Sequence, residues 1–158
     1  MNAYRLKPLS FPWPPVLYGL AILFALLADR FIGILPSVMP NGYLFYAIGA
    51  LLVAVALFLD LWAIKTLVEY RTTVMPHRGA QRLVTSGPFR YSRNPIYLGY
   101  TLITLAIGFL TGNAWFFVAA IGAAIVTTVI AIRKEEMHLL ARFGIDFEHY
   151  CQRTRRWL

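Results

Sequence analysis

The sequence is poor in charge and holds a single cysteine. Of its 158 residues, 14% are Asp, Glu, Lys or Arg, whereas 59% are hydrophobic and 15% aromatic, unlike a soluble domain. Cys151, being alone, excludes an intrachain disulfide. The sequence lacks both G-x-G-x-x-G after a strand and G-x-x-x-x-G-K-[ST], which excludes Rossmann and P-loop nucleotide sites. No small-residue cleavage site follows the basic start, so we expect no cleaved signal peptide.

Long hydrophobic runs take the place of the missing charge. A helix that crosses about 30 Å of hydrocarbon needs roughly 20 apolar residues. Four segments approach that length, at Pro15–Leu35, Tyr43–Ile64, Ile96–Leu110 and Ala114–Ile132. We therefore predict an all-α integral membrane protein with about four transmembrane helices in two hairpins and a cytoplasmic C-terminal helical tail. Residues 1–64 would form an N-terminal transmembrane hairpin, with an outer turn at "PSVMPNG", and residues 65–158 the functional core.

The positive charge is unevenly distributed. Of the fifteen Lys and Arg residues, six lie between Lys65 and Arg93, and six more between Arg133 and Arg156. By the positive-inside rule, both termini and the middle loop face the cytoplasm, and we expect a multi-pass protein of a bacterial inner membrane. The basic residues then contact anionic lipid headgroups rather than nucleic acid.

Three ionisable residues fall within the first two predicted membrane helices. Asp29, Arg30 and Asp60 all lie near predicted helix ends, where they can reach water. Ionisable groups at membrane depth are often functional, so both a functional and a structural role stay open for them.

The segment "GPFRYSRNPIYLG" (residues 87–99) places polar residues directly before the third hydrophobic run. Asn94 suits a helix N-cap and Pro95 suits the first helical turn. A helix N-terminus also attracts anions, and Arg93 adds a charge that binds carboxylates. Tyr97 follows one turn later. The segment therefore predicts either a capped helix start or an anion-binding site.

The segment "RKEEMHLL" (residues 133–140) follows the fourth hydrophobic run. Basic residues here fit a helix that ends among lipid headgroups, but two adjacent glutamates do not, since the cytoplasmic leaflet is anionic. They indicate a cationic or hydroxylated partner. Glu135 and His138 have the E-x-x-H spacing of di-metal carboxylate sites, yet the sequence holds no second E-x-x-H, so we predict no metal site. His77 and His149 are isolated. In the tail, Leu139, Leu140, Phe143 and Phe147 recur at helical spacing around a break at Gly144, which predicts a helix on the membrane surface.

Together, "LVTSGPFRYSRNPIYLG" and, one hairpin later, "EEMHLLARFGIDFEHY" resemble the isoprenylcysteine carboxyl methyltransferase and phospholipid methyltransferase superfamily in order and spacing. The resemblance implies that S-adenosylmethionine binds in a cytoplasm-facing pocket and leaves as S-adenosylhomocysteine. The resemblance further implies that loop residues line this pocket. Residues at the helix start would hold the methionine end of the cofactor, with support from an arginine, and a glutamate at the start of the tail would also contact the cofactor. By position these residues are Gln81, Arg82, Leu83, Val84, Phe89, Arg93, Asn94, Pro95, Ile96, Tyr97 and Glu135.

From this resemblance we expect methyl transfer to a lipophilic or lipidated acceptor, foremost carboxyl O-methylation of an isoprenylcysteine-like or other amphiphilic substrate. Arg133 is our candidate for steering an acidic acceptor, and we name no catalytic base. The prenylcysteine enzymes carry an arginine where this chain has Ala131. The alternatives are N-methylation of an aminophospholipid headgroup and, in another class, a non-catalytic membrane scaffold.

Overall fold

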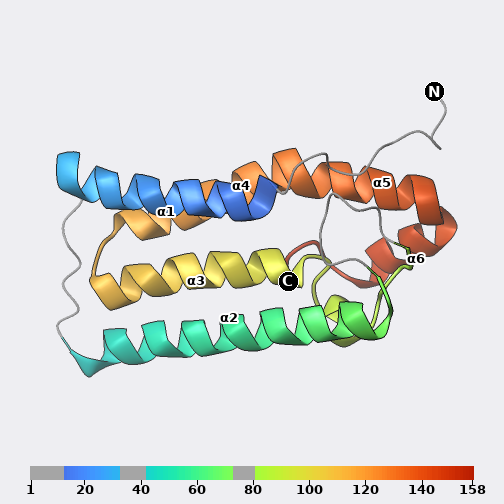
Figure 1. The fold of residues 1–158 in the computed structure, drawn as a ribbon, viewed down its shortest axis with the longest axis horizontal. Coiled ribbons are helices and arrows are strands. Elements are labelled where there is room, and N and C mark those ends of the chain that lie inside the picture. Colours follow the sequence, from blue (N-terminus) through green and yellow to red (C-terminus); the bar gives the residue numbers. More distant parts are fainter. Residues whose placement is uncertain (1–12, 33–41, 73–80) are drawn as a thin grey trace.

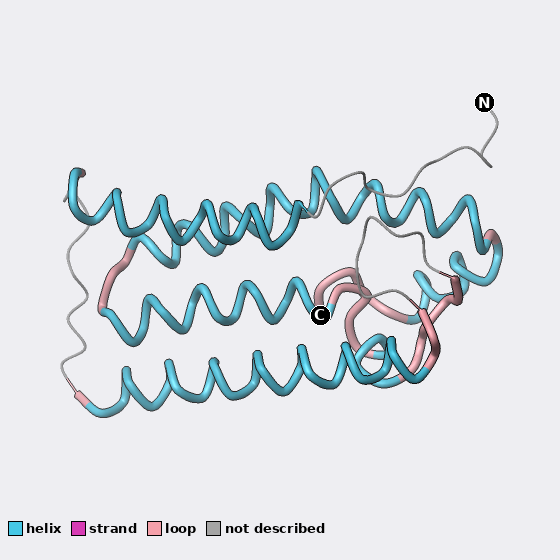
Figure 2. Tube along the Cα trace, in the orientation of Figure 1, coloured by secondary structure: helices cyan, strands magenta, loops and turns pink. Residues whose placement is uncertain are grey.

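The computed structural model describes residues 13–32, 42–72 and 81–158. Four long helices run antiparallel along one axis (Figure 1), and Figure 2 shows that loops occupy only their ends. They are α1 (Trp13–Phe31), α2 (Tyr43–Glu69), α3 (Pro95–Thr111) and α4 (Trp115–Thr127). The described residues contain no strand, so the all-α prediction is confirmed. The turn at residues 36–41, the start of the chain and His77 lie outside the described residues.

The fourth membrane helix does not end where the charges begin. After α4 the helix passes through one π-helical segment, Thr128–Ile132, and continues as α5 (Arg133–Phe143). The tail therefore starts as a direct continuation of the fourth helix, and the position of its helices at the membrane surface stays a prediction. Gly144, with φ of 50°, ends α5, and α6 (Ile145–Arg153) folds back across the end of the bundle (Figure 1). The predicted break at Gly144 is confirmed.

The helices pair across the halves of the chain. α2 packs mainly against α3, and α1 against α4, while α3 and α4 also contact each other. The face of α2 toward α3 has small residues every seven positions, at Gly49, Ala56 and Ala63, and these are buried. Small residues let membrane helices approach closely. The expected boundary between residues 64 and 65 lies inside α2, and the division into two parts stays a prediction.

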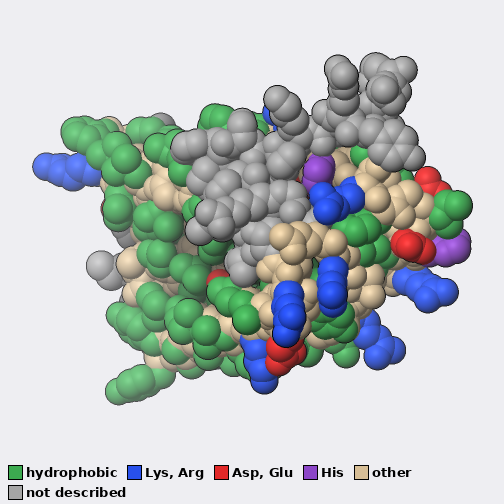
Figure 3. Space-filling model, turned by 45° about the vertical axis from the view of Figure 1, so that its right-hand side comes forward, with side chains coloured by type: hydrophobic (Ala, Val, Ile, Leu, Met, Phe, Trp, Pro, Cys, Tyr) green, Lys and Arg blue, Asp and Glu red, His purple; other side chains and the backbone are tan. Residues whose placement is uncertain are grey.

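Within the described residues, three helical segments are long and apolar enough to cross a membrane: α1, α2 and the continuous helix Trp115–Phe143. With 17 residues, α3 is apolar but shorter. Large apolar side chains remain exposed along the helices, among them Leu51, Leu57 and Ile121. Charged side chains concentrate at the end of the bundle that carries α5 and α6 (Figure 3). We call this end the loop end.

Candidate functional site

A short 3₁₀ helix, η2 (Gly87–Arg90), lies against the last turns of α2 at the loop end. Gly87 has φ of 59°, and a Cβ there would lie 2.7 Å from the Thr66 hydroxyl. Only glycine satisfies both the left-handed backbone and the close approach. The rings of Trp62 and Tyr91 lie 6.4 Å apart and extend the same contact. The loop before α3 is thereby fixed on α2.

The sequence correctly placed Asn94 at the N-cap position of α3. Asn94 precedes Pro95, but its side chain makes no capping hydrogen bond. Its amide instead donates to the carbonyl of Arg156 (2.9 Å), and its backbone N–H donates to the Ser92 hydroxyl (3.1 Å). The predicted N-cap position is therefore confirmed, whereas the side chain does not cap the helix because the C-terminal tail takes its amide. N–H groups in the first helical turn have no acceptor within the helix, so this end keeps a positive character.

The two sequence motifs meet beside this helix start. The Tyr97 hydroxyl donates to Oε1 of Glu135 at 2.8 Å, joining the first turn of α3 to the first turn of α5. Both side chains are partly buried. The contact spans 38 positions of sequence, and it places a carboxylate next to an uncapped helix N-terminus.

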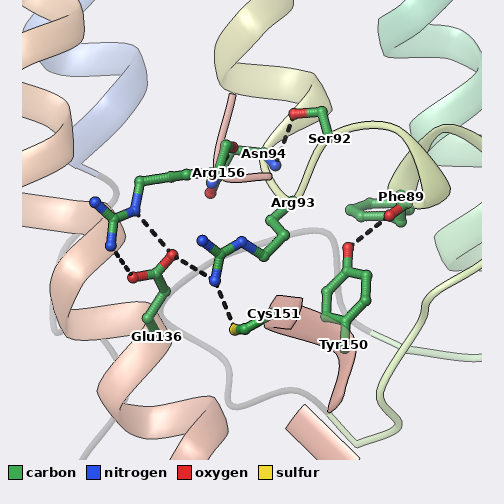
Figure 4. Close-up of polar contacts among 8 residues, drawn as sticks. All are labelled: Phe89, Ser92, Arg93, Asn94, Glu136, Tyr150, Cys151 and Arg156. Atoms are coloured by element: carbon green, nitrogen blue, oxygen red, sulfur yellow. Dashed lines mark hydrogen bonds and ion pairs between the residues drawn. The ribbon is translucent and has the colours of Figure 1, made fainter. Parts of the chain in front are cut away.

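The neighbouring carboxylate, Glu136, binds two arginines (Figure 4). Arg156 donates through Nη2 to Oε2 (2.6 Å) and through Nε to Oε1 (3.0 Å), while Nη1 of Arg93 lies 3.2 Å from Oε1. The hydrogen bonds to Glu136 raise the pKa of Arg156. Arg93 also donates to Sγ of Cys151. We call Arg93, Glu136 and Arg156 the arginine–glutamate cluster. The sequence indicated a cationic or hydroxylated partner for the two adjacent glutamates. For Glu136 the partners are two arginines of the same chain.

The C-terminal tail is tied to the loop before α3. The Tyr150 hydroxyl donates to the carbonyl of Phe89 (2.7 Å), and the Thr154 hydroxyl to that of Arg90 (3.2 Å). Burial raises the pKa of Tyr150, so this phenol keeps its proton and stays a donor. The Arg93 N–H donates to the carbonyl of Arg155 (3.0 Å). The tail is also tied to the fourth helix, because the Trp157 indole donates to the Thr128 hydroxyl (3.2 Å).

The predicted site residues fall into two groups. Those from Phe89 to Tyr97 surround the start of α3, and Tyr97 reaches Glu135. In the other group, Val84 is buried and Leu83 partly buried, whereas Gln81 and Arg82 are exposed. The Gln81 N–H donates to the Thr72 hydroxyl (3.1 Å). Arg133 is exposed on α5. Among the described residues, no hydrogen bond or ion pair joins Gln81, Arg82 or Arg133 to the Tyr97–Glu135 pair.

Sequence reasoning missed the part played by the last residues of the chain. Asn94, Glu136 and Thr128 each bind a residue of the segment Thr154–Trp157. One signal was present: a second glutamate in an anionic leaflet needs a cation, and the chain ends in "RTRRWL".

Comparison with known proteins identifies the family. The family model "Phospholipid methyltransferase" matches residues 44–146, which cover α2, the loop, α3, α4 and α5. An uncharacterised protein of Haemophilus influenzae is 35% identical over 63 residues, which are 40% of this chain and all of that protein. No solved structure matches. The match extends over more than half of the chain, so the chain belongs to the phospholipid methyltransferase family.

Proposed function

We propose that this protein transfers a methyl group from S-adenosylmethionine to a lipophilic acceptor at the membrane surface. One observation carries the proposal. The Tyr97–Glu135 hydrogen bond (2.8 Å) places a carboxylate beside the uncapped start of α3. The family membership supports the same reaction type.

The donor groups at this site suit the charges of the cofactor. Its methionine end carries a carboxylate and an ammonium group. The N–H groups of Ile96 and Tyr97, which have no acceptor within the helix, suit the carboxylate. The Glu135 carboxylate suits the ammonium or the ribose hydroxyls. Arg93 is engaged by Glu136, so we assign it a supporting role rather than direct contact. When bound, the cofactor supplies an electrophilic methyl group.

The protein contributes mainly position and exclusion of water. A carboxylate acceptor is already a nucleophile and needs no base, so we propose carboxyl O-methylation of an isoprenylcysteine-like or other amphiphilic acceptor first. Arg133, exposed on α5, would guide such an acidic acceptor. The second candidate is N-methylation of an aminophospholipid headgroup, which the family description favours. An amine acceptor must lose a proton before the methyl group is transferred.

We place the loop end in the cytoplasm, with both termini, because most of the basic residues lie between the membrane helices at that end or in the tail. The cofactor then enters from water and the acceptor from the lipid. All residues that we assign to the site lie within residues 65–158. The exposed Gln81 and Arg82 and the apolar Leu83 and Val84 would contact the adenosine part.

Binding of S-adenosylhomocysteine to the purified protein in detergent tests the proposal directly. We expect calorimetry to show binding by the wild type and a loss of about tenfold or more in Glu135→Gln, since a charge-assisted hydrogen bond is removed. Tyr97→Phe should lose less, because the carboxylate remains. Glu148→Gln is the matched control, an exposed glutamate on α6. Absence of binding to folded wild type would contradict the proposal and favour a scaffold.

A further inference from the structure

Residues 154–157, which we call the strap, join the two parts of the candidate site. The backbone of the strap binds the loop before α3. The carbonyl of Arg155 accepts the Arg93 N–H (3.0 Å), and the carbonyl of Arg156 accepts the side-chain amide of Asn94 (2.9 Å; Figure 4). The side chains of the strap reach the fourth helix and α5 instead. The strap thus binds both elements on which the candidate site is built.

The side-chain contacts of the strap enclose the stretch of helix that carries Glu135. The Trp157 indole donates to the hydroxyl of Thr128 (3.2 Å), which is the first residue of the π-helical segment. Arg156 donates through Nε and Nη2 to Glu136, the residue after Glu135. Two consecutive residues of the strap therefore hold the two ends of this stretch.

The π-helical segment lies inside the same stretch and sets the direction of Glu135. The Arg133 N–H donates to the carbonyl of Thr128, five residues earlier, whereas an α-helix pairs residues that are four apart. The π-helical turn thus takes up one extra residue, and successive residues point about 100° apart. Relaxation of this turn to an α-helix would rotate the start of α5 by about that angle and separate Glu135 from Tyr97.

Thr128 is the point at which the strap can act on this turn. Its hydroxyl donates to the carbonyl of Ala124, one turn earlier, at 2.7 Å and accepts the hydrogen bond from the Trp157 indole. Both Thr128 and Trp157 are partly buried. Single π-helical turns are rare and occur frequently at functional sites. The indole therefore binds where a π-helical turn begins, eight positions before the second contact of the strap at Glu136.

We infer that Trp157 is a positioning residue for Glu135 and acts through the Thr128 hydroxyl and the π-helical segment, while Arg156 holds the other end of the same stretch. The effect on cofactor binding rests on the proposed function. The direction of the Glu135 side chain can be tested without the cofactor, so failure of the inference and failure of the proposed function are distinguishable.

Fluorine NMR of fluorotyrosine incorporated at position 97 tests the direction of Glu135 in the purified chain without cofactor. Glu135→Ala defines the resonance of a phenol that has lost this acceptor. Trp157→Phe keeps an aromatic ring but removes the indole N–H, and it should move the resonance most of the way to that position. Thr128→Val removes the acceptor of the indole and should move the resonance to the same extent.

Two controls match these variants. Thr128→Ser keeps the hydroxyl and should keep the wild-type resonance. Thr111→Val removes a hydroxyl that also donates to a carbonyl four residues earlier, that of Ile107 (2.7 Å), but at the far end of α3. It should keep the wild-type resonance too. Because Thr111→Val and Thr128→Val lose the same kind of bond within a helix, the difference between them isolates the contact with Trp157.

Binding of S-adenosylhomocysteine separates positioning from stability. Trp157→Phe should weaken binding about fivefold in the wild type but less than about twofold in the Glu135→Gln background, because both changes act on the same carboxyl group. The unfolding curve should shift by the same amount in both backgrounds. A role in stability alone would weaken binding equally in both.

Each outcome decides the inference. An unchanged resonance in Trp157→Phe or Thr128→Val overturns it, and so does an equal change in Thr128→Ser or Thr111→Val. Full additivity of the two binding losses also overturns it. If the wild type binds no S-adenosylhomocysteine, the proposed function fails, and the resonance still decides whether Trp157 positions Glu135. If Trp157→Phe does not fold, the two variants of Thr128 make the same comparison.

Discussion

Replacement of Glu136 by glutamine tests how much the arginine–glutamate cluster contributes to stability. Glu136 is the acidic member of the arginine–glutamate cluster, and its side chain is 17% exposed. The variant keeps the shape of the side chain but removes its charge. Arg93, with a side chain 15% exposed, and Arg156, 37% exposed, then both lose their ionic partner. We expect a marked decrease in the free energy of unfolding.

The two arginines should not contribute equally. Removing one partner of a buried ion pair costs about 3–5 kcal/mol, whereas an exposed pair contributes about 0–1 kcal/mol. Arg93 is near the first case and Arg156 near the second. Glu136→Gln should therefore cost about 3 kcal/mol and Arg156→Met about 1 kcal/mol. The expected difference of about 2 kcal/mol is large enough to measure.

Unfolding of the purified protein in mixed micelles, followed by circular dichroism at increasing dodecyl sulfate, measures both variants. Glu148→Gln is again the control, and it should lie within about 0.5 kcal/mol of wild type. The double variant Glu136→Gln/Arg156→Met should cost little more than Glu136→Gln alone, because the two share one interaction. Equal costs for the two single variants, or full additivity, would refute the assignment of Arg93 as the buried member.

Two further predictions concern the helix backbones. Gly99→Ala should destabilise the protein by about 1–3 kcal/mol, because the added methyl group meets the Asp60 carboxyl group. The control Gly122→Ala has open space around it and should not destabilise the protein. Equal unfolding curves for the two variants would contradict the packing described. Insertion of one alanine between Ile132 and Arg133, directly after the π-helical segment, should turn the rest of α5 by about 100° and remove Glu135 from its position. S-adenosylhomocysteine binding by the insertion variant at wild-type strength would argue against a positioning role for the start of α5.

Local signals predicted the helices well. Pro95 sets the start of α3 because its ring fixes a helical φ and its missing N–H is not needed there. Gly144 ends α5 because only a positive φ lets the chain turn at that point. Hydrophobic length predicted the membrane segments, although α2 continues past the expected Ile64 to Glu69. Each of these features is determined by residues close to it in the sequence, so the sequence alone was sufficient to predict it.

Contacts between distant residues could not be predicted in the same way. Asn94 stands at the expected N-cap position, but nothing near it shows that its side-chain amide binds a carbonyl 62 positions later instead of capping the helix. The π-helical segment, "TVIAI", has no local residue that marks it, and its Thr128 hydroxyl receives the Trp157 indole from the end of the chain. Tertiary partners decide such features, and propensity does not.

The adjacent glutamates of α5 illustrate how the helix divides their roles. Successive residues of a helix point about 100° apart. Glu135 accordingly reaches Tyr97 on α3, and Glu136 reaches the two arginines. Glu136 neutralises charge within the protein and holds the tail against the start of α3. Glu135 accepts a hydrogen bond from the neutral Tyr97 phenol rather than from an arginine, so we propose that it is the carboxyl group that meets a ligand. A variant that turns both side chains away from these partners, such as the alanine insertion after Ile132, should therefore lose stability and cofactor binding together, whereas Glu135→Gln should lose binding alone.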